Sequence, residues 1–390
     1  MGAIGRVCMP TSKRGWWNWA KTTSCAYLLR CALSRIDSQH FWDLMDALPV
    51  EAIPKIEAEL LHKVQTHYPL EHDTLLFDTS NFFTFIASTN QRCTIAQRGK
   101  NKQKRNDLRQ VGLALVVTRK DSIPLFHSSY QGNLHDSKVF HQVIGNIKER
   151  LVALNFDLEK HTLVFDRGNN SKKNLALVAE LKLHYLGALV PYQHQSLLEE
   201  AQGHYQTVVV NDEPLDVYRT EKITWDQPRT VVVFVSDRLK AGQLRGIYQA
   251  LAHNEKELRK IQQTLLSRRG ASQDRASLEE RIGKLLKGQF LDGLIQWSLS
   301  ETADGHIRLD FLIDQKQLAG VEEKLGFRIL MTDRHDWDTA RIIETYYNQA
   351  TVEAAFKNMK NPHHLALKPQ FHWTDQKIIV HNFMCVVGYL

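Results

Sequence analysis

Cysteine is scarce in this sequence and is not arranged in pairs. Five cysteines occur among 390 residues, and none belongs to a C-x-x-C motif. An odd, scattered set argues against a disulfide framework and against a cysteine zinc site, and it favours a reducing compartment. Glycine and proline are also few, at 20 and 10 residues, which excludes collagen-like and low-complexity chains.

A long apolar run is absent as well. The longest, IIVHNFMCVVGYL at 378–390, contains His381 and Asn382, and it is shorter than the roughly 20 residues that a membrane-spanning helix needs. The first residues lack the apolar segment of a secretory signal. We therefore expect a cytoplasmic protein with no membrane partner.

The composition that remains is that of a globular protein with a basic excess. Hydrophobic residues make up 43%, charged residues 24%, and the net charge is +7, which favours a polyanionic partner. Six cations and one acid, Asp107, fall in RGKNKQKRNDLR at 98–109, here called the basic loop. The pattern fits a solvated loop and a phosphate-contacting loop equally well. The cations are Arg98, Lys100, Lys102, Lys104, Arg105 and Arg109.

The order of patterns along the chain predicts a mixed α/β fold with an insertion. Short apolar strands alternate with helices after residue 73, including a hairpin at 111–130 and a helix at 135–154 with Asp136 or Ser137 as its N-cap. Two long charged helices, at 238–267 and 276–287, then interrupt this alternation. We expect four regions: a helical N-terminal region at 1–70, the first part of the core at 71–202, an inserted subdomain at 203–325, and the final part of the core at 326–390.

Three carboxylates stand at the ends or edges of predicted elements. Asp78 lies in LLFDTSN, Asp166 ends the strand LVFD, and Glu353 lies on a helix at 345–360. Each alone has an ordinary explanation as a turn, cap or solvated residue. Together, at the edge of an α/β sheet where ligand sites gather, they form an all-oxygen set that suits Mg²⁺ or Mn²⁺. Two such ions can activate water or a 3′-hydroxyl for phosphoryl displacement.

Other kinds of site find less support in the sequence. His363 and His364 are adjacent and cannot share one helical face, and no H-E-x-x-H, P-loop, G-x-G-x-x-G or nucleophile elbow occurs. A glycosidase built on two of the acids remains conceivable. It would leave the basic loop without a role.

The helix at 345–360, TYYNQATVEAAFKNMK, has a polar edge. At about 100° per residue, Tyr346, Gln349, Glu353 and Lys360 fall within a stripe roughly 60° wide. This Tyr-x₂-Gln-x₃-Glu-x₆-Lys pattern resembles the Tyr-x₂-Arg-x₃-Glu-x₆-Lys signature of a large branch of bacterial insertion-sequence transposases, which are DDE enzymes. The segments LLFDTSNFF, YQGNLHDSKVF and LVFDRGNNSKKNL also resemble parts of these proteins.

The resemblance implies a fold and a chemistry. The fold is an RNase H-like mixed five-stranded sheet flanked by helices, with a subdomain inserted before the last core helix. Asp78, Asp166 and Glu353 would bind Mg²⁺ or Mn²⁺, as two ions. The enzyme would cleave double-stranded DNA at the terminal inverted repeats of its element and join the 3′-hydroxyl to target DNA. It would act as a homodimer near the bacterial nucleoid, and the N-terminal region at 1–70 is a candidate for binding the DNA ends.

The resemblance also implies DNA contacts from the polar edge. Tyr346 and Lys360 would contact phosphates or a flipped base, whereas Gln349 replaces an arginine by a neutral amide and is expected to weaken end binding. Two alternatives stay open: a DNA-binding relic without catalysis, and a metal-dependent nuclease of the same fold. The cations predicted to join the DNA contacts are Arg98, Lys100, Lys102, Lys104 and Arg105.

Overall fold

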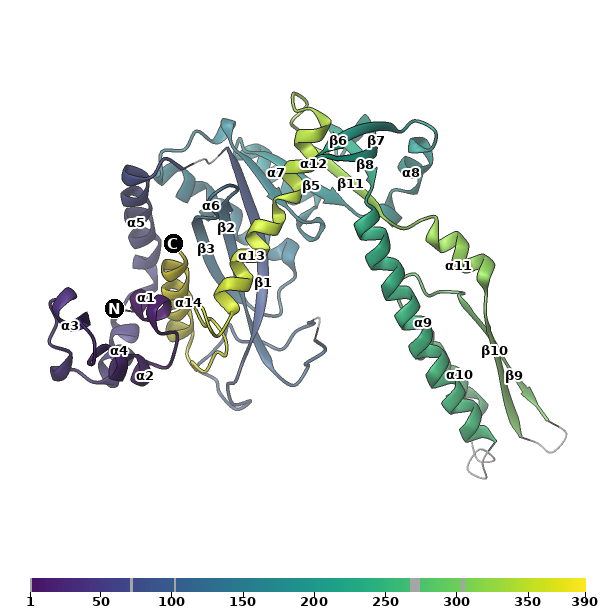
Figure 1. Ribbon diagram of the computed structural model, residues 1–390, viewed down its shortest axis with the longest axis horizontal. Helices are drawn as coiled ribbons and strands as arrows, with labels where there is room; N and C mark the ends of the chain where they lie inside the picture. Colours follow the sequence, from purple (N-terminus) through teal and green to yellow (C-terminus); the bar gives the residue numbers. More distant parts are fainter. Residues whose placement is uncertain (1, 71–72, 102, 267–273, 303–305) are drawn as a thin grey trace.

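The computed structural model describes residues 2–70, 73–101, 103–266, 274–302 and 306–390. Figure 1 shows three parts: helices at the N-terminal end, a central sheet covered by helices, and an arm that extends away from the sheet. Lys102, one of the predicted DNA contacts, lies outside the described residues.

The central sheet contains nine strands among the described residues. They are β1 (Thr74–Thr84), β2 (Arg109–Thr118), β3 (Pro124–Gln131), β4 (Thr162–Phe165), β5 (His184–Leu189), β6 (Gln206–Val210), β7 (Glu213–Thr224), β8 (Gln227–Val235) and β11 (Phe327–Thr332). Their order is β3-β2-β1-β4-β5-β11-β8-β7-β6. Strand β1 is antiparallel to β2 and parallel to β4, and β4 is parallel to β5. The predicted mixed α/β class is confirmed. The predicted count of five strands is wrong, because β11, β8, β7 and β6 extend the sheet beyond β5.

Helices cover both faces of this sheet. One face packs against α5 (Ile53–His67), α6 (Asp136–Ala153), α7 (Lys172–Glu180) and α8 (Gln195–Ala201), and the other against α12 (Thr339–Tyr347), α13 (Gln349–Lys360) and α14 (Asp375–Tyr389). Successive side chains of a strand point to opposite faces. In β1, Leu75 and Phe77 therefore join the core beneath α6, while Leu76 and Phe82 join the core beneath α13.

The arm has its own small core. It consists of α9 (Asp237–Leu265), α10 (Arg275–Leu286), α11 (Gln315–Glu322) and the antiparallel pair β9 (Ile295–Glu301) and β10 (Ile307–Ile313). Leu258, Ile282 and Leu309 are buried within it. The two long charged helices predicted here are confirmed as α9 and α10. Because β6, β7 and β8 pair within the central sheet, the part that stands apart begins with α9. The predicted division into domains stays a prediction.

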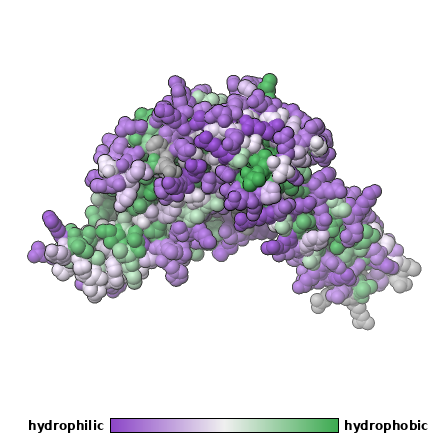
Figure 2. Space-filling model, turned by 45° about the horizontal axis from the view of Figure 1, so that its top comes forward, coloured by the Kyte–Doolittle hydropathy of each residue, from purple (hydrophilic) through white to green (hydrophobic). Residues whose placement is uncertain are grey.

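The N-terminal helices pack beside the C-terminal helix. Here α1 (Gly2–Cys8), α2 (Lys13–Ala20), α3 (Cys25–Leu28) and α4 (Ser38–Ala47) precede α5, and α1 and α4 contact α14. Met45 and Phe383 are buried at this contact. Figure 2 shows hydrophobic residues on the surface of this end. The large side chains exposed in the N-terminal helices include Tyr27 and Leu28. Among the described residues, no helix is both long and apolar enough to cross a membrane.

Two local predictions are wrong. The helix predicted at 345–360 is interrupted at Asn348, whose φ of −66° and ψ of −7° separate α12 from α13. The N-cap of α6 is His135, whose side chain accepts a hydrogen bond from the Ser137 backbone N–H. The Asp136 carboxylate is therefore available for other contacts.

Candidate active site

Asp78 lies in the middle of β1 and faces α13. It is an even-numbered position of the strand, like Leu76 and Phe82, whose side chains enter the core under that helix. Its side chain is half-buried, and its backbone pairs with Leu115 of β2. Because β1 pairs with β2 on one side and β4 on the other, the position of this carboxylate along the strand direction is fixed.

Asp166 stands at the end of β4, next to β1. The parallel register pairs Leu76 with Val164, so Asp78 and Asp166 follow that pair by two residues each and lie at the same edge of the sheet. Asp166 is exposed and caps the short 3₁₀ helix η4 (Arg167–Asn169), because its Oδ1 accepts from the Arg167 N–H at 2.7 Å. Oδ1 also accepts from the Tyr346 hydroxyl at 3.3 Å.

Glu353 projects from α13, the helix that lies along β1 (Figure 1). Val352, Phe356 and Met359 bury the opposite side of this helix in the core, whereas Glu353 is exposed. The apolar residues recur at a helical spacing, which fixes the rotation of α13 about its axis. The carboxylate thereby lies on the polar edge of α13, together with Gln349 and Lys360, which contact β1.

The three carboxylates influence one another electrostatically. Burial raises the pKa of Asp78 from its ordinary value of 3.8 to about 7; the Thr79 backbone N–H opposes this rise, and the negative charges of Asp166, Glu353 and Asp136 add to it. Like charges close together disfavour ionisation of the most buried member. The structure thus brings the three predicted acids into one electrostatic group.

Asp136 is a fourth acid of this group, and its role was not predicted from the sequence. It is the first residue of α6, and its Oδ1 accepts from the Thr79 hydroxyl at 3.0 Å. A Cβ atom at Gly168 would lie 3.2 Å from Asp136 Oδ2, so this glycine leaves room for the carboxylate beside the loop that follows Asp166. Its sequence signal was only a position just before a helix, which is ordinary for a cap.

The chemistry of this group fits a divalent cation, although its present geometry is open. All the side-chain donors are carboxylate oxygens, which Mg²⁺ and Mn²⁺ prefer, and a cation would offset the burial and the repulsion that raise the Asp78 pKa. Within the part of the chain that the structure describes, no three His, Cys, Asp or Glu side chains are gathered closely enough to hold a metal ion. The triad therefore stays a prediction that rests on donor chemistry and charge.

The remaining members of the polar edge contact the protein itself. Tyr346 is buried, and its hydroxyl donates to Asp166. Gln349 Nε2 donates to the Phe77 carbonyl at 3.3 Å. Lys360 Nζ donates to the Ser80 hydroxyl and, at 2.8 Å, to the Asn81 carbonyl. The DNA contacts predicted for these three residues stay predictions.

The basic loop lies at the same edge of the sheet as Asp166. It connects β1 to β2, and because β1 and β4 are parallel, the end of β1 and the end of β4 face the same way. Arg98, Lys100 and Lys104 are exposed. Arg105 instead forms a two-point ion pair with Asp107, at 2.8 and 2.7 Å. The structure thus places exposed cations on the side of the sheet toward which β1 and β4 both end.

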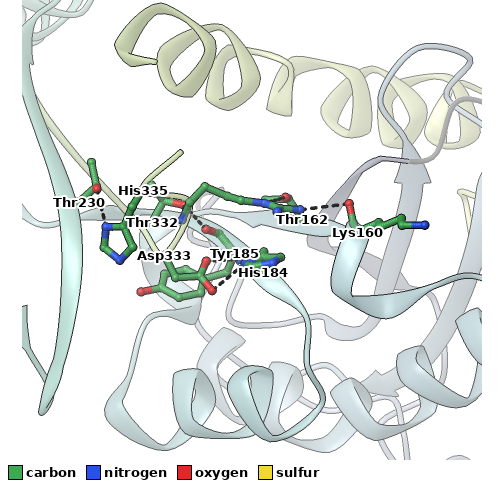
Figure 3. Close-up of polar contacts among 9 residues, drawn as sticks. Lys160, Thr162, His184, Tyr185, Thr230, Thr332, Asp333 and His335 are labelled. Carbon is green, nitrogen blue, oxygen red and sulfur yellow. Dashed lines mark hydrogen bonds and ion pairs between the residues drawn. The ribbon is translucent and has the colours of Figure 1, made fainter. Parts of the chain in front are cut away.

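A second polar cluster lies at the opposite edge (Figure 3). Asp333, which follows β11, accepts from the Tyr185 backbone N–H at 2.9 Å and lies 3.0 Å from His184 Nδ1. Arg334 Nε donates to the Thr162 hydroxyl at 3.0 Å. These contacts join the starts of β4 and β5 to the end of β11. The cluster is therefore separate from the carboxylate group.

The solved structures that this chain resembles include two transposase complexes, both distant. One is a piggyBac transposase synaptic complex with hairpin DNA: identity is 8%, the TM-score is 0.38, and the match covers 81% of this chain and 45% of the other. The other is a Mos1 transposase paired-end complex with the left transposon end, at 9% identity and a TM-score of 0.22, covering 45% and 53%. The chain thus spans about half of either protein, and at these scores we draw no argument from them.

Comparison with family models identifies a family over most of the chain. No curated protein matches the chain, but residues 84–370 match the model described as a transposase DDE domain. The matched range includes Asp166, Asp136 and Glu353, and Asp78 lies just before it. Since this range is most of the sequence, the chain belongs to the transposase DDE domain family.

Proposed function

We propose that this protein is a metal-dependent transposase that cuts DNA at the ends of its own element and transfers the 3′-hydroxyl to target DNA. The observation that carries the proposal is the acidic group at the sheet edge, where burial and the charges of Asp166, Glu353 and Asp136 raise the pKa of Asp78 to about 7. Such a group needs a cation to be fully ionised at neutral pH.

Each triad member has a distinct part in this proposal. Asp78 and Asp166, from neighbouring parallel strands, would bind Mg²⁺ or Mn²⁺ on one side, and Glu353 would bind it from the helix above them. When bound, two such ions activate the attacking hydroxyl or water and stabilise the leaving oxygen. The core holds β1, β4 and α13, the elements that carry the three carboxylates, and would thereby keep those carboxylates in fixed relative positions.

The DNA itself would lie along the same edge. Arg98, Lys100 and Lys104 are exposed there, and exposed cations attract the phosphate backbone without reading its sequence. Terminal inverted repeats come as two copies, so we propose that the protein binds them as a homodimer.

The test is a cleavage assay on a plasmid that carries the DNA flanking the gene, with Mg²⁺ present or removed by EDTA. Wild type is expected to cut at the repeats only with Mg²⁺, and Asp166→Asn is expected to bind the DNA without cutting. Asp292→Asn, which changes an exposed aspartate of the arm, is the matched control and should cut like wild type. Equal cutting by wild type and Asp166→Asn would refute the triad.

A DNA-binding protein without catalysis is the second candidate. The observation in its favour is that the described carboxylates are not gathered at metal-binding distance from one another. It predicts that wild type binds the flanking DNA, shows no Mg²⁺-dependent cleavage, and is indistinguishable from Asp166→Asn. Cleavage without joining to a target plasmid would instead indicate a nuclease of the same fold.

A further inference from the structure

Two residues of α13 form hydrogen bonds to β1 on either side of Asp78. Gln349 Nε2 donates to the carbonyl of Phe77, the residue before that aspartate. Lys360 Nζ donates to the Ser80 hydroxyl and to the Asn81 carbonyl, which follow it. A helix that packed on the strand through apolar contacts alone could slide along it. These polar contacts at both ends of α13 oppose such sliding.

The separation of the two donors along α13 is close to the separation of their acceptors along β1. Gln349 and Lys360 lie about 16 Å apart along the helix, at about 1.5 Å per residue. Phe77 and Asn81 lie about 13 Å apart along the strand, at about 3.3 Å per residue. The long lysine side chain covers the remaining few ångströms. Glu353 lies between the two donors on α13, and Asp78 lies between their acceptors on β1.

Tyr346 makes a third contact, to the other aspartate. Its ring is only 7% exposed, and the Arg328 guanidinium lies 5.7 Å from the ring centre. Its hydroxyl donates to Asp166 Oδ1 at 3.3 Å. The phenol can therefore serve as a fixed donor to that carboxylate.

We propose that Tyr346, Gln349 and Lys360 are positioning residues that set the carboxylates relative to one another, and that their main contacts are not with DNA. Gln349 and Lys360 keep Glu353 level with the β1 aspartate, and Tyr346 orients Asp166. This inference rests on the proposed function, since it assigns these residues to the metal-binding carboxylates. It also explains why a neutral amide can serve at position 349, because a carbonyl needs a donor and not a positive charge.

The first test compares Tyr346→Phe with wild type. Removing an outer hydrogen bond to a metal ligand is expected to weaken Mn²⁺ binding, measured by calorimetry, by about tenfold or more. The affinity for the flanking DNA, and its dependence on salt, should not change. Tyr248→Phe is the matched control, because its hydroxyl also donates to a carboxylate, Glu322, at 2.7 Å but lies in the arm. It should leave Mn²⁺ binding unchanged.

Two results of this test would overturn the role of Tyr346. One is unchanged or tighter Mn²⁺ binding by Tyr346→Phe at an unchanged melting temperature. The other is a weaker salt dependence of DNA binding, with a slope smaller by about one, which is the loss expected for a phosphate contact.

The second test needs neither metal nor activity. Lys360→Met and Ser80→Ala, singly and together, are compared by urea unfolding. If the hydrogen bond from Lys360 to Ser80 stabilises the fold, the double variant should lose clearly less free energy of unfolding than the two single variants lose in sum. Additive losses of free energy of unfolding, together with a smaller salt slope of DNA binding for Lys360→Met, would refute the positioning role of Lys360. Should wild type bind no Mn²⁺, the proposed triad fails, and this cycle still decides whether the residues position α13 on β1.

Discussion

Replacing Asp78 by asparagine should stabilise the folded protein at alkaline pH. The folded state raises the pKa of this carboxyl from 3.8 to about 7, mainly by burial, with contributions from the neighbouring acids. One pKa unit corresponds to about 1.4 kcal/mol. The ionised carboxylate therefore lowers the free energy of unfolding by up to about 4 kcal/mol at pH 8 in the absence of a cation. Asparagine has nearly the same shape and no charge, so Asp78→Asn should recover most of this loss.

The sign and range of the effect follow from the two pKa values. Because the folded-state pKa lies above the unfolded value, the contribution of the Asp78 carboxyl to stability is fully present below about pH 3.8 and is lost as the pH rises through 7. The advantage of Asp78→Asn should thus fall from about 4 kcal/mol at pH 8 to about 1.5 kcal/mol at pH 5 and about 0.5 kcal/mol at pH 4.

The assay is urea unfolding in EDTA at these three pH values. Asp292→Asn, an exposed aspartate in the arm, controls for the general effect of removing a negative charge. Mg²⁺ should then narrow the gap by stabilising wild type alone, by about 2.7 kcal/mol at a concentration one hundred times the dissociation constant. If Asp78→Asn is no more stable than wild type at pH 8 in EDTA, the electrostatic account of this site is wrong.

Three further changes test neighbouring parts of the structure. Asp136→Asn removes one of the charges that raise the Asp78 pKa, so in its presence the gain in stability from Asp78→Asn should stop growing at a lower pH and reach a smaller maximum; an unchanged pH profile would contradict this. Glu57→Ala should lower the free energy of unfolding by about 3 to 5 kcal/mol, because Glu57 is buried in ion pairs with His127 and Arg150; urea unfolding within about 0.5 kcal/mol of wild type would refute it. Replacing Arg98, Lys100 and Lys104 of the basic loop by glutamine should reduce the slope of log affinity against log salt by up to about 2.7. DNA titration at several salt concentrations measures this slope, and an unchanged slope would show that these residues do not contact DNA.

Local patterns in the sequence were sufficient for most elements of the core. The β2–β3 hairpin and α6 were predicted from strand alternation and helical periodicity, and the structure confirms both. Asp166 was likewise expected at the end of a strand, where the structure has it. These features depend on residues close in sequence, which periodicity and turn chemistry report directly.

Features that depend on distant residues were missed. The pairing of β6 to β8 with the central sheet was not predicted, because it depends on the contact of β8 with β11, which lies almost one hundred residues later. Nothing local in either strand specifies that partner. Asp136 looked like an ordinary helix cap, and only the packing of α6 beside β1 brings its carboxylate to the Thr79 hydroxyl. Tyr346 likewise gave no sign that its hydroxyl would meet Asp166, 180 positions earlier.

The side chains of β1 alternate between the two faces of the sheet, so this one strand contacts acidic residues on both faces. Its even positions, Asp78 and Ser80, face α13, while Thr79 faces the start of α6 and holds Asp136 there. Leu76 and Phe77 are fully buried on the two sides, so β1 cannot move outward to hydrate its aspartate without exposing both cores. Burial of one such side chain is worth roughly 1.5 to 3 kcal/mol, so exposing both would cost roughly 3 to 6 kcal/mol, at least about as much as the roughly 4 kcal/mol that the buried, ionised carboxylate costs at pH 8. The strain in the acidic group is therefore relieved more easily by taking up a proton or a cation than by moving the strand, which is the property that a metal-dependent site at this edge requires.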